Sequence, residues 1–188
     1  MSRTAPLTAT ATLAIAGAII WAGWHREGQT FSISASEMGR IGRIMPTTAG
    51  LWLNSNGATL ETTLDLELGR ALVVVSAHGT AAFGQWPWLV LTVNGRDVAD
   101  WRVTSTEARL YQALVFTLPG SNHVELRYVN DYDDPESGQD RNLYIESCRI
   151  IQGHAASALH RLAPYEFERA LTALPAATAH ASGPAGHS

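Results

Sequence analysis

The chain has 188 residues, of which 46% are hydrophobic, and its formal net charge is −4. A chain of this length can build one packed domain with appendages but hardly two full domains. The negative charge and the scattered basic residues exclude a surface for binding nucleic acid. Cys148 is the one cysteine, so it has no partner for an internal disulfide, and we predict that it is a small core residue.

Residues 5–24 form an uncharged stretch that follows a short tail at residues 1–4. As a helix, twenty residues span about 30 Å, which matches the hydrocarbon core of a bilayer. Trp21 and Trp24 close the stretch, as aromatic side chains do at membrane–water interfaces. We therefore predict a transmembrane helix at residues 5–24 that contacts the lipid bilayer, with Trp21 and Trp24 at the membrane interface.

A cleaved signal peptide is the alternative for this stretch. Signal peptidase requires small residues three and one positions before the cut, whereas Ile19, Ile20 and Trp21 are bulky. The anchor is therefore favoured. Arg3 and the free amino terminus favour an N-terminus on the inside, against Arg26 on the other flank. The expected location is the bacterial inner membrane, with one span and the C-terminal domain on the periplasmic side.

After a linker at residues 25–28, residues 29–153 are predicted to form an all-β domain. Leu60–Leu68 alternates apolar and polar residues, while residues 71–75 are a continuous apolar run suited to a buried inner strand. Further strands are predicted at residues 89–93, 100–103, 110–118, 123–128 and 143–151, with turns at Asn94-Gly95 and Pro119-Gly120. Short strands at this spacing indicate a β-sandwich of jelly-roll type.

The segment between the last two predicted strands is strongly acidic, with five carboxylates within ten residues: Asp131, Asp133, Asp134, Glu136 and Asp140. Like charges this close raise one another's pKa unless a cation or a hydrogen-bond network compensates them. A calcium ion and a solvated acidic turn are the two interpretations. The segment is not an EF-hand, because the sixth and twelfth positions from Asp131 hold Glu136 and Asn142 instead of Gly and Glu.

Several motifs resemble, in order and spacing, the calcium-dependent xylan-binding carbohydrate-binding modules of families 36 and 60. They are Gly79–Pro87, Leu89–Arg96, the pair Asn130-Asp131 and the run Asp140–Tyr144, and the resemblance covers roughly residues 29 to 153. It implies a jelly-roll sandwich in which Asp131 and Asp140 bind calcium, with Asp133 and Asp134 as weaker candidates. It also implies that vicinal hydroxyls of a sugar fill the open positions of the ion.

One departure from these families lies near the start of the domain. Residues 33–38 lack the Ala-Glu pair with which related modules commonly open. A second, structural calcium is therefore not expected. Among the aromatic residues, Tyr132 inside the acidic segment and Trp86 beside Pro87 are predicted to be exposed and to bind the ligand.

No catalytic residue is predicted. The sequence has no nucleophile elbow, phosphate loop or His-Glu-x-x-His motif. One short acidic segment cannot easily place two carboxylates on opposite sides of a substrate cleft, as glycoside hydrolysis requires.

Residues 154–174 are predicted to be a short helical extension. Phe167, Leu171 and Leu174 recur at helical spacing after Pro164, which suits a first turn. This apolar face either packs on the sandwich or docks on a partner protein. Residues 175–188 consist mostly of Ala, Gly, Pro, His and Ser, and are predicted to be a flexible tail.

Two functions are compatible with these features. We favour a non-catalytic, membrane-anchored accessory subunit that docks on a larger membrane protein complex, for example a bacterial photosynthetic reaction centre with its antenna. The reason is that xylan-binding modules normally accompany secreted hydrolases, whereas this chain combines the module with an anchor. The alternative is calcium-dependent binding of xylan-like or cell-surface polysaccharide by a membrane-tethered module.

Overall fold

The computed structural model describes residues 29–174 and 177–178. Within these residues no helix is both long and apolar enough to cross a membrane. The predicted transmembrane helix with Trp21 and Trp24 lies outside the described residues, as does the linker at residues 25–28. Of the predicted tail, residues 177–178 are described.

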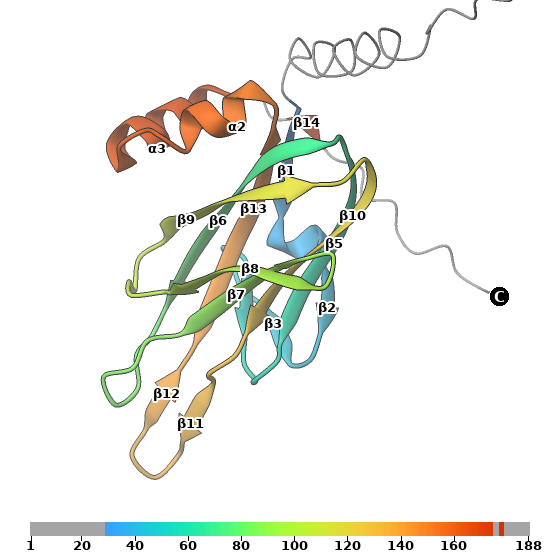
Figure 1. Cartoon of the computed structure of the whole chain (residues 1–188). Helices are drawn as coiled ribbons and strands as arrows, with labels where there is room; N and C mark the ends of the chain where they lie inside the picture. Colours follow the sequence, from blue (N-terminus) through green and yellow to red (C-terminus); the bar gives the residue numbers. More distant parts are fainter. Residues whose placement is uncertain (1–28, 175–176, 179–188) are drawn as a thin grey trace, which may run out of the picture.

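Two sheets stack face to face and form a β-sandwich, as predicted (Figure 1). In the larger sheet, β13 pairs with β6 along one side, and β6 pairs in turn with β9. The other side of β13 is shared by β1 and β4, which pair with successive parts of it. The strands of this sheet are β1 (Thr30–Ser34), β3 (Ile44–Pro46), β4 (Leu51–Leu53), β6 (Gly69–Gly79), β9 (Arg109–Thr117), β13 (Leu143–Gln152) and β14 (Ala177–Thr178).

The smaller sheet has five antiparallel strands. Their order is β2 (Gly39–Ile41), β5 (Thr59–Leu66), β10 (Gly120–Tyr128), β7 (Trp88–Val93) and β8 (Arg96–Arg102). A 3₁₀ turn, η1 (Ala35–Glu37), connects β1 with β2. The long predicted strands are confirmed, whereas the three-residue strands β2, β3 and β4 were not anticipated, because three residues are too few to show an alternating pattern.

The main core lies between the two sheets, and Cys148 is buried in it, as predicted. Burial raises the pKa of its thiol to about 12, so the thiolate is scarce at neutral pH. In β6 the side chains of Val73 and Val75 enter this core, while Leu72 and Val74 belong to a second apolar cluster on the outer face. The continuous apolar run therefore marks a strand that is buried on both faces.

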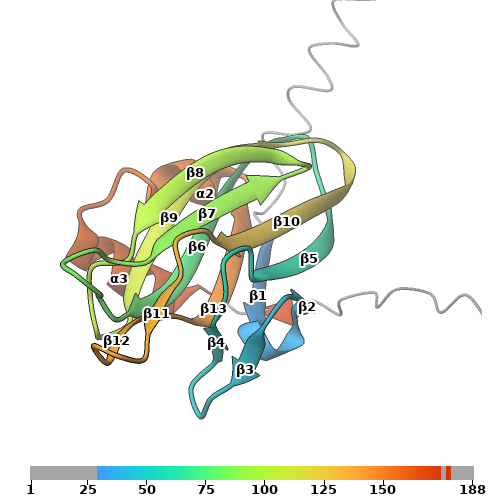
Figure 2. The same ribbon diagram turned by 90° about the horizontal axis from the view of Figure 1, so that it is seen from below.

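Two helices build the second cluster by covering the outer face of the larger sheet (Figure 2). They are α2 (His154–Leu159), which contacts β6 and β13, and α3 (Pro164–Ala173). Phe167 and Leu171 are buried there, and Leu174 packs against the cluster. Of the two interpretations of this apolar face, the structure favours packing on the sandwich.

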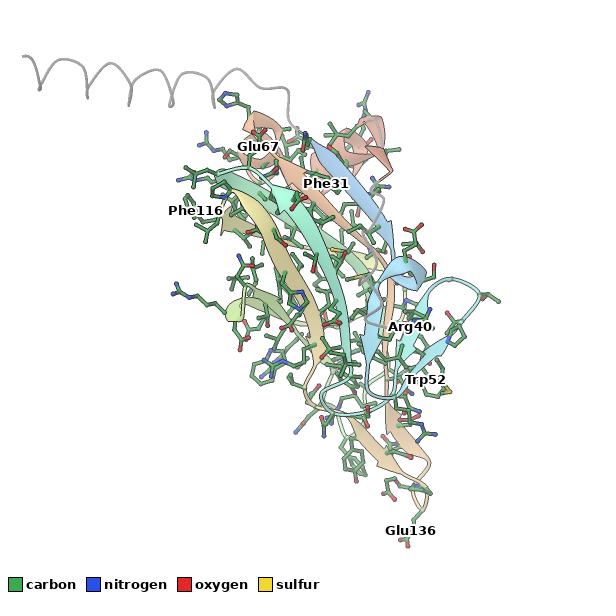
Figure 3. All side chains as sticks on the ribbon, turned by 90° about the vertical axis from the view of Figure 1, so that its right-hand side faces the viewer. Phe31, Arg40, Trp52, Glu67, Phe116 and Glu136 are labelled. Atoms are coloured by element: carbon green, nitrogen blue, oxygen red, sulfur yellow. The ribbon has the colours of Figure 1, made fainter. Side chains whose placement is uncertain are left out.

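Three loops meet at one end of the sandwich, namely residues 54–58, 80–87 and 129–142. The last of these contains a two-stranded hairpin, β11 (Tyr132–Asp134) and β12 (Gln139–Arg141). Figure 3 shows Glu136 at the tip of this hairpin, at the opposite end of the molecule from Glu67 and Phe116. All the predicted calcium ligands lie at the hairpin end.

Candidate functional site

Asp131 and Asp140 each bury a carboxylate oxygen without a hydrogen-bond donor. Among the described residues, the Oδ1 atoms of both side chains are buried and have no partner. Burial raises the pKa of Asp131 above its usual value, and the neighbouring Asp140 carboxylate raises it further. Buried polar atoms are almost always paired, because an unpaired one costs about 1–3 kcal/mol, and more when it is charged. This pair of oxygens fits a cation that the two aspartates share.

The remaining groups of the two aspartates are held firmly. Asp140 Oδ2 accepts a hydrogen bond of 2.8 Å from the Asn142 side-chain amide. The Asn142 amide oxygen in turn accepts a bond of 2.6 Å from the indole N–H of Trp52. The Asp131 backbone N–H donates to Asn56 Oδ1 at 2.7 Å. The Asp140 carboxylate and the Asp131 backbone are thus each held by a neighbour, and neither contact uses an Oδ1 atom.

Thr80 ties the end of β6 to the hairpin. Its hydroxyl donates to the Asp140 carbonyl at 3.0 Å and accepts from the Asn142 backbone N–H at 3.0 Å. Gly79 precedes it where two segments of the backbone approach closely, and a Cβ atom at this position would lie 2.6 Å from the Asn142 carbonyl oxygen. Glycine is therefore required at this position to let the strand carrying Thr80 reach Asp140.

Arg141 organises the site through backbone carbonyls and not through ion pairs with Asp131 or Asp140. Its buried guanidinium donates to the carbonyls of Asn130 at 2.6 Å, Gln85 at 3.0 Å and Ala82 at 3.1 Å. Among the described residues no carboxylate accepts from it. The Arg141 carbonyl accepts a bond of 2.6 Å from the buried Tyr128 hydroxyl. Arg141 therefore clamps the 80–87 loop to the hairpin, and the negative charge of Asp131 and Asp140 is left for another cation.

The two weaker ligand candidates have different environments. Asp133 lies opposite Asp140 in the β11–β12 pairing, and its charge contributes to the raised pKa of Asp131. Asp134 instead stabilises the hairpin turn, since its carboxylate accepts bonds of 2.6 Å from the Ser137 hydroxyl and 3.1 Å from the Glu136 N–H. The Ser137 hydroxyl lowers the pKa of Asp134. Asp133 remains a candidate, whereas both oxygens of Asp134 are used within the turn.

A tight turn at residues 82–85 presents an aromatic side chain that the sequence did not reveal. Ala82 and Gln85 exchange backbone hydrogen bonds of 3.0 Å, and both central residues, Phe83 and Gly84, have positive φ angles of 50° and 72°. Such turns favour Asn-Gly, and a positive φ is uncommon for a bulky residue. Phe83 nevertheless occupies the position with 61% of its surface exposed. Exposure and an unfavourable backbone together make Phe83 a candidate ligand-binding residue.

Phe83 and Tyr132 form an exposed aromatic pair beside the two aspartates. Their rings meet edge to face with centroids 5.3 Å apart. Tyr132 is 38% exposed, as predicted for a ligand-binding residue, and the Arg141 guanidinium lies 5.8 Å from its ring centroid. The Tyr132 ring of this pair thus lies beside Arg141, which also organises the loops around the aspartates.

Trp86, the other predicted aromatic residue, is half-buried and lies at a separate pocket of about 410 Å³. Asn130 borders this pocket, and its side chain accepts from the Trp88 N–H at 2.6 Å and donates to the Trp86 carbonyl at 3.0 Å. The pocket therefore adjoins the acidic site through the residue that precedes Asp131. Its lining consists of Gly84, Gln85, Trp86, Trp88, Arg102, Thr104 and Asn130.

The described sandwich has the fold of carbohydrate-binding modules. It is similar to the CBM36-1 domain of a multidomain xylanase from the hindgut metagenome of Trinervitermes trinervoides, with a TM-score of 0.56, 15% identity, and coverage of 65% of this chain and 96% of that one. It is also similar to the carbohydrate-binding module CBM36 in complex with calcium and xylotriose, with a TM-score of 0.53, 14% identity, and coverage of 63% and 98%. At these identities the similarity establishes the fold alone.

A sequence family gives the more specific result. Residues 72–161 match family CBM60, described as a Ca-dependent carbohydrate-binding module that binds xylan. This range contains Thr80, Phe83, Asp131, Asp140 and Asn142. No curated protein matches the chain. The matches support the predicted alternative, polysaccharide binding, and nothing in them supports docking on a photosynthetic complex, the example given for the favoured accessory subunit.

Proposed function

We propose that this protein binds xylan or a closely related polysaccharide in a calcium-dependent manner. The observation that carries the proposal is the pair of buried, unpartnered Oδ1 atoms on Asp131 and Asp140. Burying two like charges side by side is unfavourable unless a cation lies between them. The family match over residues 72–161 indicates which cation and which polymer.

Asp131 and Asp140 are the residues that would hold calcium, with Asp133 nearby as a further oxygen donor. When bound, calcium supplies a hard cation whose free coordination positions accept neighbouring hydroxyls of a sugar. The chain's contribution is preorganisation. Asn142 holds one oxygen of Asp140, Asn56 holds the backbone of Asp131, and Arg141 fixes the loops around them.

The aromatic pair Phe83 and Tyr132 offers an apolar surface for a sugar ring. Xylose has no charged group, so a polymer of xylose is recognised by its hydroxyls and by the C–H face of its rings. Exposed aromatic side chains bury such faces favourably. The position of the pair beside Asp131 and Asp140 lets one sugar contact the cation and a ring together.

The accessory-subunit interpretation rested on the combination of the module with an anchor. The apolar helix face considered for docking on a partner is buried in the cluster that α2, β6 and β13 complete. Tethering of the module to a membrane remains a proposal, since residues 5–24 lie outside the described part.

The test is binding of the full chain, in detergent, to soluble xylan with calcium and with chelator. We expect binding and a raised melting temperature with calcium, and the loss of both with chelator, because calcium binds only the folded state. Asp140→Asn preserves shape and should abolish both effects. Asp134→Asn is the matched control and should retain them, since Asp134 acts only in the turn.

Phe83→Asn separates sugar contact from metal binding. Asparagine tolerates the positive φ better than phenylalanine, so the variant should fold normally and keep its calcium-induced rise in melting temperature. Xylan affinity should fall roughly tenfold, which corresponds to about 1.4 kcal/mol. Xylan binding that is indifferent to chelator and to Asp140→Asn would overturn the proposal.

A further inference from the structure

A second cluster of metal-ligating side chains lies on the outer face of the smaller sheet. Glu61 on β5 and His123 and Glu125 on β10 place one ligand atom each within 4.8 Å of the others. His123 Nε2 is 3.2 Å from Glu125 Oε1 and 3.4 Å from Glu61 Oε2. The three side chains are 28–40% exposed, so a cation could enter from solvent.

The strand register places the two glutamates directly opposite each other, so their negative charges repel. Glu61 pairs with Glu125 across the antiparallel β5–β10 ladder, and His123 pairs with Thr63. Like charges directly opposite one another destabilise a sheet. In residues 29–174 and 177–178, His123 is the ion-pair partner found for each glutamate, and Arg127 of β10 pairs with Asp97 instead. The cation must therefore come from His123 itself or from solution.

The surroundings favour a fixed arrangement of the three groups. Thr63 Oγ1 lies 3.2 Å from His123 Nδ1, so an N–H at Nδ1 can donate to it and leave the Nε2 lone pair facing both carboxylates. Glu61 folds over Gly39 of β2, where an added Cβ would lie 2.9 Å from Glu61 Cγ. The glycine thus leaves room for the glutamate beside His123.

The distances suit a small divalent metal. Zinc binds imidazole nitrogen and carboxylate oxygen at about 2.0–2.2 Å, so two such ligands on a tetrahedral ion stand roughly 3.3 Å apart. The two nitrogen–oxygen distances of 3.2 and 3.4 Å bracket this value. An imidazole ligand selects against calcium, which prefers oxygen.

We propose that Glu61, His123 and Glu125 form a surface site for Zn²⁺ or a similar divalent transition metal, separate from the acidic site at the hairpin. Tyr128 marks the end of β10 at the acidic site, because its hydroxyl donates to the Arg141 carbonyl. Glu125 lies three residues before it, about 10 Å along the strand. The Glu125 side chain faces outward, whereas Tyr128 is buried in the core, so the two sites lie on different faces of β10. The metal would link β5 to β10 and leave one coordination position open to solvent.

The experiment is titration of the calcium-saturated full chain with Zn²⁺ by calorimetry. The Glu61→Gln and His123→Asn variants should each weaken one binding event at least tenfold. His160→Asn is the matched control, because His160 is exposed on another face and its loss should change nothing. Circular dichroism in the absence of zinc should show that all variants fold, since the altered side chains lie on the surface.

A proton is the competing occupant, because a charged imidazolium could bridge the two glutamates. In that case wild type, Glu61→Gln and His123→Asn would give the same zinc isotherm, with zinc bound elsewhere or not at all. That result would overturn the proposal. A loss of calcium-dependent xylan binding in these variants would instead contradict the separateness of the two sites.

Discussion

At the scale of single residues, some carboxylate oxygens of the acidic site accept short hydrogen bonds and others do not. Asp140 Oδ2 accepts a short bond from Asn142, while its Oδ1 and that of Asp131 have no donor in the described part of the chain. A solvated acidic turn, which was the simpler interpretation of the sequence, would expose these oxygens to water. Their burial therefore favours a ligand site over an ordinary surface loop.

The raised pKa of Asp131 predicts how pH acts on the site. Without calcium, a carboxyl whose folded pKa is raised stabilises the fold at low pH, and this contribution is lost as pH rises through the folded pKa. Calcium acts in the opposite direction because it requires the ionised form. The calcium-induced rise in melting temperature should therefore shrink on acidification, beginning above the pH at which an ordinary aspartate titrates.

Melting curves with calcium and with chelator, recorded between about pH 7 and about pH 4, check this expectation. Asp131→Asn is the control, and its two curves should coincide at every pH. A constant separation of the wild-type curves across this range would show that Asp131 is not a ligand.

At the scale of elements, α3 packs on the sandwich and contributes to its second apolar cluster. The sequence showed its apolar face but not what covers it, and the structure places Phe167 and Leu171 against β6 and β13. Arg149 of β13 also donates to the Leu171 carbonyl at 3.3 Å. The helix therefore closes the outer face of the larger sheet, which would otherwise expose Leu72 and Val74.

Phe167→Ala should lower the free energy of unfolding by about 3 kcal/mol, because it leaves a cavity under α3. Tyr165→Ala in the same helix is the matched control and should change it by less than about 0.5 kcal/mol, since Tyr165 is 76% exposed. Chemical denaturation measures both. Equal and small effects would mean that α3 does not pack stably on the sandwich and that its face is free for a partner.

At the scale of the whole molecule, the chain enters the sandwich far from the acidic site. The Gln29 carbonyl accepts from the Gln152 N–H at 2.8 Å, at the end of β13, whereas Asn142 precedes the start of that strand. Ten residues of strand separate the two ends by about 30 Å. A tether at residues 5–24 would therefore leave the hairpin end, with Glu136 at its tip in Figure 3, pointing away from its attachment.

Liposomes carrying the full chain should thus sediment with insoluble xylan in calcium and remain in solution with chelator. Liposomes with Asp140→Asn should stay in solution under both conditions. Binding in detergent but not on liposomes would mean that the membrane covers the site and that the tether is arranged differently. Failure of the chain to enter liposomes would remove the anchor itself.

Much of the fold followed from local pattern. Alternation along β5 and the apolar run in β6 are properties of consecutive residues, so they predict strands and their burial without knowledge of neighbours. The Asn130-Asp131 pair and the Asp140–Tyr144 run likewise resembled the calcium-dependent modules, and this resemblance gave the two ligand candidates. Cys148 was placed in the core from its type and its strand alone.

What the sequence could not decide depends on which strands lie side by side. Trp52, Thr80 and Asn142 are far apart in the chain, and only the pairing of β4 and β6 with β13 brings them to Asp140. The Glu61–His123–Glu125 cluster exists only because the β5–β10 register sets Glu61 opposite Glu125, since a shift of one residue would turn one partner to the other face. Local pattern determined the strands and the two aspartates, while long-range pairing, which no local signal encodes, decided the groups that surround them.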